Sequence, residues 1–270
     1  MDNVLSIPKL VFIVPYRDRI QHKQFFTKYM EFIMEDYKKE DYEVFFIHQT
    51  DKQPFNRGAM KNIGFLAIKE KYPYFYKNIT FVFNDVDTLP YTKNLLPYET
   101  REGIVKHFYG FTFALGGIFS IKGGDFEKIN GFPNLWGWSQ EDNIIYMRAI
   151  SNGLNVDRST FFKIYDNNIL QFVDNMNKTI SKKEVLQSYE RDYNFGLNNI
   201  SDINMKIENE FVHVYNFISE SNPRDLHFSN HNLLENKGKI KISASEKTSL
   251  KKTSLKKNNY CGNISGLRFI

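Results

Sequence analysis

Apolar residues in the first half of the chain form short runs that alternate with longer segments of helical spacing. Three runs predict buried strands, at 9–15, 42–48 and 79–87. Between them, residues 20–38 and 57–71 place apolar side chains three and four positions apart, which predicts two amphipathic helices. Strand, helix, strand, helix, strand is typical of a parallel sheet with right-handed crossovers, so the predicted fold class is α/β.

The second half of the chain adds shorter elements to this pattern. The glycine pair Gly116–Gly117 indicates either a bulge or a close approach of the backbone to a ligand. The expected elements are strands at 113–122 and 211–217, and helices at 124–130, within 135–153 and at 181–193.

The last residues differ from the rest in composition. Residues 238–270 hold eight Lys and Arg against one Glu, a net charge of +7, so the other 237 residues carry −2 of the chain's +5. The segment "TSLKKTSLKK" (248–257) repeats five residues directly and cannot form a core. We therefore expect one domain at 1–237 and a mobile basic low-complexity tail at 238–270. The tail is either a tether for an anionic surface or only a solvated end.

Composition excludes several classes of protein. The single cysteine, Cys261, excludes an internal disulfide and a cysteine-based zinc site. The N-terminus lacks the pattern of a signal peptide and no apolar run reaches transmembrane length, so we expect a cytoplasmic protein without a membrane span. The acidic body counts against nucleic acid as a partner.

Two carboxylates, Asp85 and Asp87, close the apolar run at 79–87. Alternate side chains of a strand point to one side, so both carboxylates would face one spot at the strand's carboxyl end, where sheets of this class bind ligands. Like charges held together need a cation, hydrogen bonds or water between them. The alternative is an ordinary turn, for which Asp and Pro90 are common residues.

Further candidate residues follow other predicted elements. Arg17 and Arg19 follow the first strand and Arg57 opens a helix, and guanidinium groups there suit phosphate oxygens. The segment "WGWSQED" (136–142) sets two indoles before Glu141 and Asp142, a pattern that suits a sugar. Taken singly, these features could be surface ion pairs, packing and helix capping. Taken together, they favour a diphosphate bridged by a divalent metal beside a sugar site, as in a glycosyltransferase.

The sequence resembles the β-1,4-galactosyltransferase family over roughly residues 10–155. The resemblance rests on five motifs in the family's order, namely "FIVPYRDR", "FNRGAMKNIGF", "FVFNDVDTLP", "ALGGIFSIKGGDFEKINGFPN" and "WGWSQED". It implies a GT-A fold, with a Rossmann-like and mostly parallel central sheet between helices. It also implies a uridine diphosphate sugar as donor, Mn²⁺ or Mg²⁺ as cofactor, a glycan acceptor, and inversion at the anomeric carbon.

The resemblance also assigns roles to residues. Asp142 falls on the catalytic base, Glu141 on its acidic neighbour, Asp87 on the metal ligand and Trp138 on the tryptophan of the mobile loop. The expected donor- and nucleotide-binding residues are Pro15, Arg17, Arg19, Phe55, Arg57, Asp85, Val86, Gly116, Gly117 and Trp138.

The chain departs from the family pattern in three places. Ser139, Gln140 and Asn143 replace two glycines and an acid of the family's tryptophan motif. Ala114 stands where the family has a donor-contacting tyrosine, which would leave room for an N-acetylhexosamine. The family's metal-binding histidine has no clear counterpart. The substitutes considered are Gln171, Asp174 and His213.

The function that these observations favour is transfer of a hexose or N-acetylhexosamine from a uridine diphosphate sugar to a glycan hydroxyl. The competing class is a non-catalytic protein that binds a glycan or nucleotide sugar on the same fold. The four acids argue for catalysis, because a binding protein has little need of a buried base. The exact donor, the acceptor, the linkage and the oligomeric state are not specified by the sequence.

Overall fold

The structure, a computed structural model, describes residues 6–173, 176–188 and 194–235. Asp174 and the expected basic tail lie outside these residues. The helices are α1 (Ile20–Ile33), α2 (Arg57–Lys71), α3 (Gly123–Lys128), α4 (Glu141–Ser151) and α5 (Lys182–Gln187), with short 3₁₀ turns at Lys39–Asp41, Leu197–Asn199 and Pro223–Asp225. None of the described helices is both long enough and apolar enough to cross a membrane.

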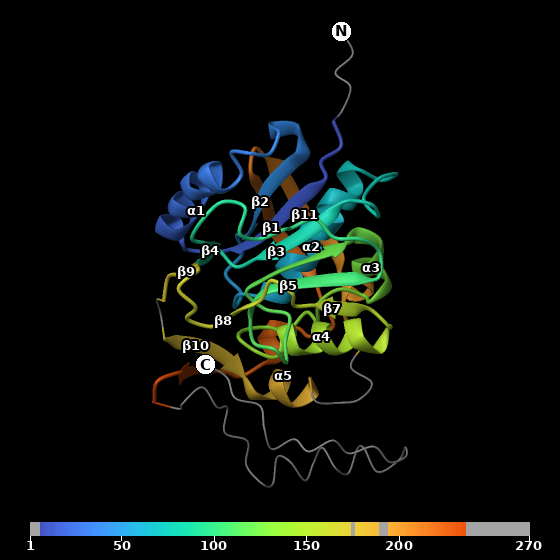
Figure 1. The fold of residues 1–270 in the computed structure, drawn as a ribbon. Helices are drawn as coiled ribbons and strands as arrows, with labels where there is room; N and C mark the ends of the chain where they lie inside the picture. The colour runs from blue at the N-terminus through green and yellow to red at the C-terminus, as the bar shows by residue number, and fades with distance from the viewer. Residues whose placement is uncertain (1–5, 174–175, 189–193, 236–270) are drawn as a thin grey trace.

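A nine-stranded mixed sheet forms the centre of the molecule (Figure 1). Its strand order is β11-β12-β2-β1-β3-β6-β5-β7, and β8 also pairs with β5. Most of its strand pairs are parallel, while β11–β12, β3–β6 and β6–β5 are antiparallel. The strands are β1 (Leu10–Tyr16), β2 (Tyr42–Gln49), β3 (Thr80–Asn84), β5 (Ile104–Gly110), β6 (Ile118–Lys122), β7 (Asn155–Asp157), β8 (Phe162–Lys163), β11 (Ser201–Glu208) and β12 (Phe211–Ile218).

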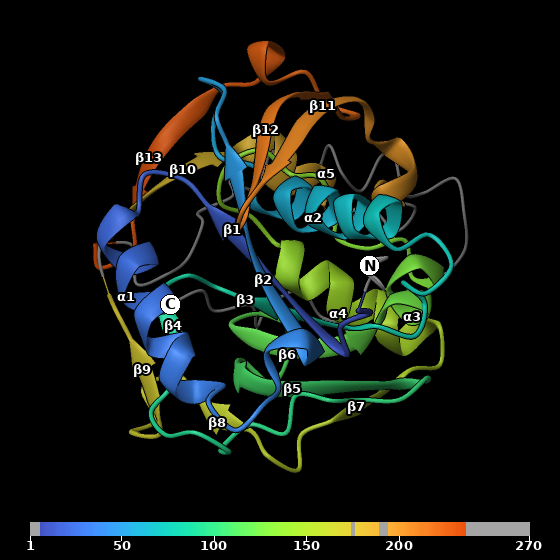
Figure 2. The ribbon, with the colours of Figure 1, turned by 90° about the horizontal axis from the view of Figure 1, so that it is seen from above.

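Strand β1 shows why the sheet is covered on both faces. All seven of its residues are buried, as expected of a central parallel strand. Phe12 and its alternate neighbours pack with α1, whereas Ile13 packs with α2 on the other face. Seen from above, α1 lies on one side of the sheet and α2, α3 and α4 on the other (Figure 2). Each fully buried large apolar side chain contributes about 1.5–3 kcal/mol to folding.

Two small ribbons lie beside the central sheet. Strand β4 (Thr88–Pro90) pairs with β9 (Ile169–Gln171), and β10 (Asn177–Ser181) pairs with β13 (Phe228–Asn232), both antiparallel. The first ribbon begins one residue after Asp87. The ribbons therefore bring late parts of the chain to the carboxyl end of β3.

The structure confirms the predicted α/β class and the bounds of α2, and it corrects several other bounds. Helix α1 ends at Ile33 rather than at residue 38, and α5 ends at Gln187, before a part of the expected helix that is not described. The apolar run at 79–87 is a strand only to Asn84, and the run at 113–122 only from Ile118. In both places a turn replaces the expected strand residues, and these turns carry site residues.

Candidate active site

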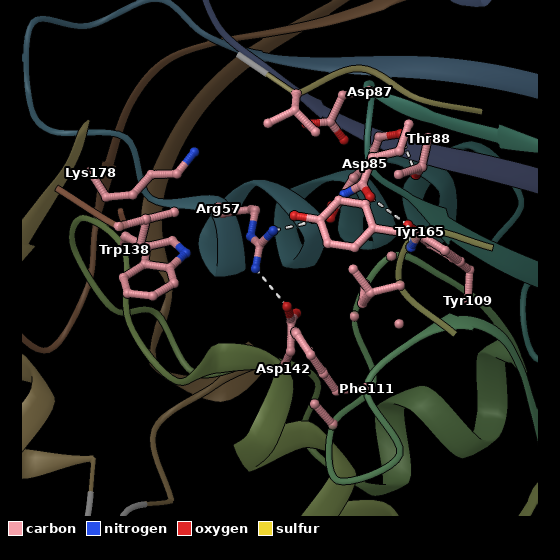
Figure 3. A pocket seen from close by; sticks show the side chains of 18 of the residues that line it. Arg57, Asp85, Asp87, Thr88, Tyr109, Phe111, Trp138, Asp142, Tyr165 and Lys178 are labelled. Carbon is pink, nitrogen blue, oxygen red and sulfur yellow. Dashed lines mark hydrogen bonds and ion pairs between the residues drawn. The ribbon is translucent and has the colours of Figure 1, made fainter. Parts of the chain in front are cut away.

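A pocket lies where β3 ends and where helices α2 and α4 begin (Figure 3). Side chains from segments far apart in the sequence line it. They include Arg57 at the start of α2, Asp85 and Asp87 after β3, and Asp142 at the start of α4. Trp138, Ala114, Gly116, Gly117, Gln171 and Lys178 also line the pocket. The structure thus brings together most of the residues that the sequence predicts for the site.

A turn, rather than an extended strand, aims Asp85 and Asp87 into the pocket. The Thr88 amide donates to the Asp85 carbonyl at 3.1 Å, which closes the turn. The buried Asn84 side chain donates to the carbonyls of Asp85 and Thr88, both at 2.8 Å. The Asp85 amide donates to the carbonyl of Gly117 at 3.1 Å. Asp85 and Asp87 both line the pocket, as expected. The hydrogen bonds of the turn bring them there, and the alternation of side chains along a strand does not.

Arg57 is the centre of the charged cluster. It is the first residue of α2, and the Asn56 side chain caps that helix by accepting the amide of Ala59 at 2.9 Å. Its guanidinium donates to Asp85 Oδ2 at 3.1 Å and to Asp142 Oδ2 at 2.6 Å (Figure 3). It also donates to Glu141 Oε1 at 2.8 Å. Burial opposes the charge of Arg57, but the three carboxylates outweigh burial and raise the pKa of its guanidinium.

Lys61 is a second cation of this cluster and is not among the residues predicted from the sequence for the site. It lies one helical turn after Arg57, and its side chain is 1% exposed. Its Nζ lies 3.6 Å from Asp85 Oδ1, 3.4 Å from Asp142 Oδ1 and 4.6 Å from the ring centroid of Phe132. The signal in the sequence is the spacing of four between two basic residues, which places both on one face of a helix.

Glu141 and Asp142 open α4 and have different surroundings. Glu141 is buried and pairs with Arg57, and its Oε2 has no hydrogen-bond partner among the described residues. Burial raises the pKa of Glu141 in spite of Arg57. The Asp142 side chain is 18% exposed and faces the pocket. Gln140, not Asp142, is the N-cap residue, so the alternative of Asp142 as a mere helix cap is wrong.

Gly116 makes room for the Asp142 carboxylate. A Cβ atom at this position would lie 2.7 Å from Asp142 Oδ2, closer than carbon and oxygen can approach. Gly117 has a φ of +68°, which favours glycine, and a Cβ there would meet the carbonyl oxygen of Tyr109 at 2.5 Å. Gly116 therefore permits a close approach to the Asp142 carboxylate, and Gly117 a close approach to the backbone of β5. Ala114 is buried and lines the same pocket.

The two tryptophans of the "WGW" segment have different roles. Trp138 lines the pocket, and its backbone amide donates to the carbonyl of Thr179 in β10 at 2.7 Å. Trp136 is buried, stacks on Phe217 and donates from its indole to Ser221 at 2.9 Å. Of the two, Trp138 is thus the tryptophan that is placed to meet a ligand.

Asp87 is the carboxylate that best fits a metal ion. Burial, and then the neighbouring charge of Asp85, raise the pKa of Asp87 to about 6. Within the described part of the chain, no donor lies at hydrogen-bond distance from its carboxylate, although Arg19, Arg57 and Lys178 are close enough to stabilise its charge. A divalent cation bound to Asp87 would offset the cost of burying its negative charge beside Asp85. Carboxylate oxygens are ligands that suit Mn²⁺ and Mg²⁺.

Of the two substitutes for a metal-binding histidine that the structure describes, Gln171 lines the pocket and His213 does not. Gln171 pairs with Thr88 across β4 and β9, and its Oε1 accepts the hydroxyl of Tyr109 at 2.5 Å. His213 lies on β12, separated from β3 by β2 and β1, and its Nδ1 lies 3.2 Å from His48 Nδ1. Neighbouring strands lie about 4.8 Å apart, so β12 lies three such spacings from β3. His213 is therefore too far from Asp87 to bind the same metal ion. Asp174 lies outside the described residues.

The remaining predicted nucleotide contacts lie beside the pocket and not in its lining. Arg17 donates to the carbonyl of Gln49 at 3.2 Å, to the carbonyl of Asp51 at 2.6 Å and to that of Gln53, and it lies over the ring of Phe55. Arg17 therefore shapes the 49–55 loop. That Pro15, Arg17, Arg19, Phe55 and Val86 contact a nucleotide stays a prediction.

Tyr109 and Lys178 also belong to the site without having been expected there. Tyr109 lies in the pocket wall and binds Gln171. Lys178 of β10 lies close enough to Asp85 and Asp87 to stabilise both charges. Neither residue stands in a recognisable motif, because β5 and β10 are short strands whose positions depend on pairing with distant segments.

Comparison with known proteins places this site in a family. Residues 2–99 match the model described as the N-terminal region of glycosyl transferase group 7, and residues 106–169 match that of the N-terminal domain of galactosyltransferase. β-1,4-galactosyltransferase 1 of Bos taurus is 31% identical over 57% of this chain and 39% of its own length. β-1,4-galactosyltransferase 7 of Drosophila melanogaster is 27% identical over 78% of this chain and 68% of its own length.

Solved structures show the same fold. The catalytic domain of Drosophila β-1,4-galactosyltransferase 7, solved with xylobiose, superposes with a TM-score of 0.60 and 22% identity, over 81% of this chain and 97% of that one. A mutant of that enzyme, solved with manganese, UDP-Gal and xylobiose, superposes with the same TM-score.

The fold is the GT-A fold of glycosyltransferases. The two matched models cover more than half of the sequence, and the chain belongs to the β-1,4-galactosyltransferase family. It spans about two-fifths of the length of the bovine relative and about two-thirds of the length of the Drosophila relative.

Proposed function

We propose that the protein is an inverting glycosyltransferase that moves a hexose or N-acetylhexosamine from a uridine diphosphate sugar to a hydroxyl of a glycan acceptor. The observation that carries this proposal is the position of Asp142. Its carboxylate lies in the same pocket as Asp85 and Asp87, at 2.6 Å from Arg57. The Drosophila relative whose structure holds manganese, UDP-Gal and xylobiose supports the same donor and acceptor classes here.

In the proposed reaction the acceptor oxygen attacks the anomeric carbon from the face opposite the diphosphate. A bond forms between that oxygen and the anomeric carbon, while the bond from this carbon to the diphosphate oxygen breaks. The bonding electrons leave with uridine diphosphate, and Asp142 takes the proton of the attacking hydroxyl. Attack from the opposite face inverts the configuration of the anomeric carbon.

The other residues of the pocket bind and orient the substrates. Asp87 is the expected ligand of a divalent metal, Mn²⁺ or Mg²⁺, with the amide oxygen of Gln171 as a second candidate ligand. When bound, the metal supplies positive charge to the leaving diphosphate. Arg57 and Lys178 provide further positive charge in the pocket. The indole of Trp138 offers a face on which a sugar ring can stack, and Ala114 leaves space for a 2-acetamido group.

The substitution Asp142→Asn tests this function, because it keeps the shape of the side chain and removes the base. We expect the transfer rate at saturating substrates to fall by roughly 10²–10⁴, the usual contribution of a positioned general base. Donor affinity, measured by calorimetry with uridine diphosphate and Mn²⁺, should change little. Asp225→Asn, at an exposed aspartate outside the pocket, is the matched control and should leave both quantities unchanged.

Two outcomes would contradict the proposal. A transfer rate in Asp142→Asn close to that of the wild type would exclude Asp142 as the base. Binding of uridine diphosphate sugars by the wild type without any transfer to a panel of glycan acceptors would instead favour the competing class, a non-catalytic binding protein.

A further inference from the structure

Lys61 is a buried cation that stands within the segment "FNRGAMKNIGF" and has no role in the proposed reaction as described so far. An ammonium group with 1% exposure is costly to bury unless carboxylates compensate for it. Its neighbours meet this requirement, since Nζ lies 3.6 Å from Asp85 Oδ1 and 3.4 Å from Asp142 Oδ1. The face of the Phe132 ring, 4.6 Å from Nζ, covers a further side of the ammonium.

Arg57 and Lys61 share the same two carboxylates, one oxygen each. Arg57 binds the Oδ2 atoms of Asp85 and Asp142, and Lys61 lies next to their Oδ1 atoms. The two cations differ in access to the pocket. The Arg57 side chain is 23% exposed and lines the pocket, whereas Lys61 is enclosed and does not line it.

This difference determines which cation can turn to a ligand. A guanidinium that faces the pocket can reach the oxygens of a diphosphate and bind two of them at once. Arg57 would then release Asp142 Oδ2, the oxygen that it binds at 2.6 Å in the present structure. Lys61 is covered by Phe132 and the two carboxylates, so it stays in place when the donor enters.

We propose that Lys61 is a positioning residue that holds the Asp142 carboxylate by Oδ1 while Arg57 turns to the donor and leaves Oδ2 open for the acceptor hydroxyl. This inference rests on the proposed function, because it assigns Asp142 as the base. Lys61 itself touches neither substrate. Its contribution is the orientation of the carboxylate during the proton transfer.

The substitution Lys61→Met tests the inference, because methionine fills a similar volume without a charge. We expect kcat to fall by roughly 10–10², the cost of a reacting group that is misplaced by about 1 Å. Donor affinity and the KM of the acceptor should stay within about threefold, since Lys61 contacts neither ligand. Lys69→Met is the control on the same helix. Lys69 binds Glu127 at 2.5 Å on the outer surface, and its loss should not change kcat.

A double-mutant cycle with Asp142→Asn separates positioning from a general effect on the fold. If Lys61 acts through Asp142, then Lys61→Met should cause no further loss of rate in the Asp142→Asn background. Lys61→Gln, which keeps one N–H donor for the carboxylates, should have a kcat between the wild type and Lys61→Met. If Lys61→Met does not fold, Lys61→Gln and its cycle with Asp142→Asn carry the test.

The outcomes are distinct from those that test the function itself. A wild type that binds the donor but never transfers would overturn the proposed function. If the wild type does transfer the sugar, three results on the variants would overturn the role of Lys61 and leave the proposed function standing. These are an unchanged kcat in Lys61→Met, an equal loss in both backgrounds, or a donor affinity that falls in parallel with kcat.

Discussion

Two arginines, Arg17 directly after β1 and Arg57 at the start of α2, show how partners determine the role of a charge. The guanidinium of Arg17 donates mainly to backbone carbonyls of the 49–53 loop and has one carboxylate partner, Asp51. Arg57 instead binds three carboxylates, of which two face the pocket. Backbone carbonyls cannot be exchanged without unfolding a loop, whereas carboxylates around a pocket can be exchanged for a ligand. The partners of Arg17 therefore suit a structural role, and those of Arg57 suit ligand binding and chemistry.

The largest effect should come from Arg57→Met. This change leaves Asp85, Glu141 and Asp142 without the cation that binds all three, so we expect a loss of stability of about 3 kcal/mol, as for a broken buried ion pair. Transfer should fall by at least about 10³, because both donor binding and the geometry of Asp142 depend on this side chain. Chemical denaturation and steady-state rates measure the two effects. A variant with near-normal kcat/KM would show that Arg57 is only structural.

A second, smaller effect should come from Gly116→Ala, which changes geometry and no charge. The new Cβ would lie 2.7 Å from Asp142 Oδ2, so the carboxylate or the 114–117 turn must move. We expect kcat to fall by about 10–10² with little change in donor affinity. Gly124→Ala is a matched control, since its Cβ would meet Lys77 at an ordinary 3.5 Å. Equal kcat values for the two alanine variants would contradict the close approach seen at Gly116.

The smallest effect on the reaction should come from Arg17→Met. Loss of its hydrogen bonds to the 49–53 loop should lower stability by about 1–3 kcal/mol. The transfer rate of the folded variant should stay within about tenfold of that of the wild type. We expect any decrease to come mainly from displacement of Phe55, over whose ring Arg17 lies. A loss as large as that of Arg57→Met would remove the distinction between the two arginines and would place Arg17 on the nucleotide itself.

The sequence predicts the central elements well because their signals are local. Helix α2 has its predicted bounds, since the Asn56 cap and the apolar face of the helix are both readable from neighbouring residues. Arg57, Asp85, Asp87, Trp138 and Asp142 stand next to element ends, where an α/β sheet collects ligand-binding residues, and all of them line the pocket.

What the sequence does not predict depends on distant pairing. Strand β11 has mostly exposed, polar residues and is a strand only because it pairs with β12. Strand β5 contains Lys106 and His107, which obscure its apolar pattern. In the sequence, Lys61 is an ordinary lysine of a predicted helix. Its role depends on Asp85 and Asp142, which the turn after β3 and the start of α4 place beside it. His213 is a candidate ligand by its residue type alone, yet strand order separates it from Asp87.

The place of β12 in the sheet has a consequence for biosynthesis. Strand β12 pairs with β2 in parallel, and His213 lies opposite His48 although 165 residues separate them. The edge of β2 therefore has no partner until most of the chain has left the ribosome, and an unpaired apolar strand edge is prone to aggregation. Closing so long a loop is also slow. We therefore expect nascent chains to need a chaperone at this edge until residues 211–218 emerge and dock.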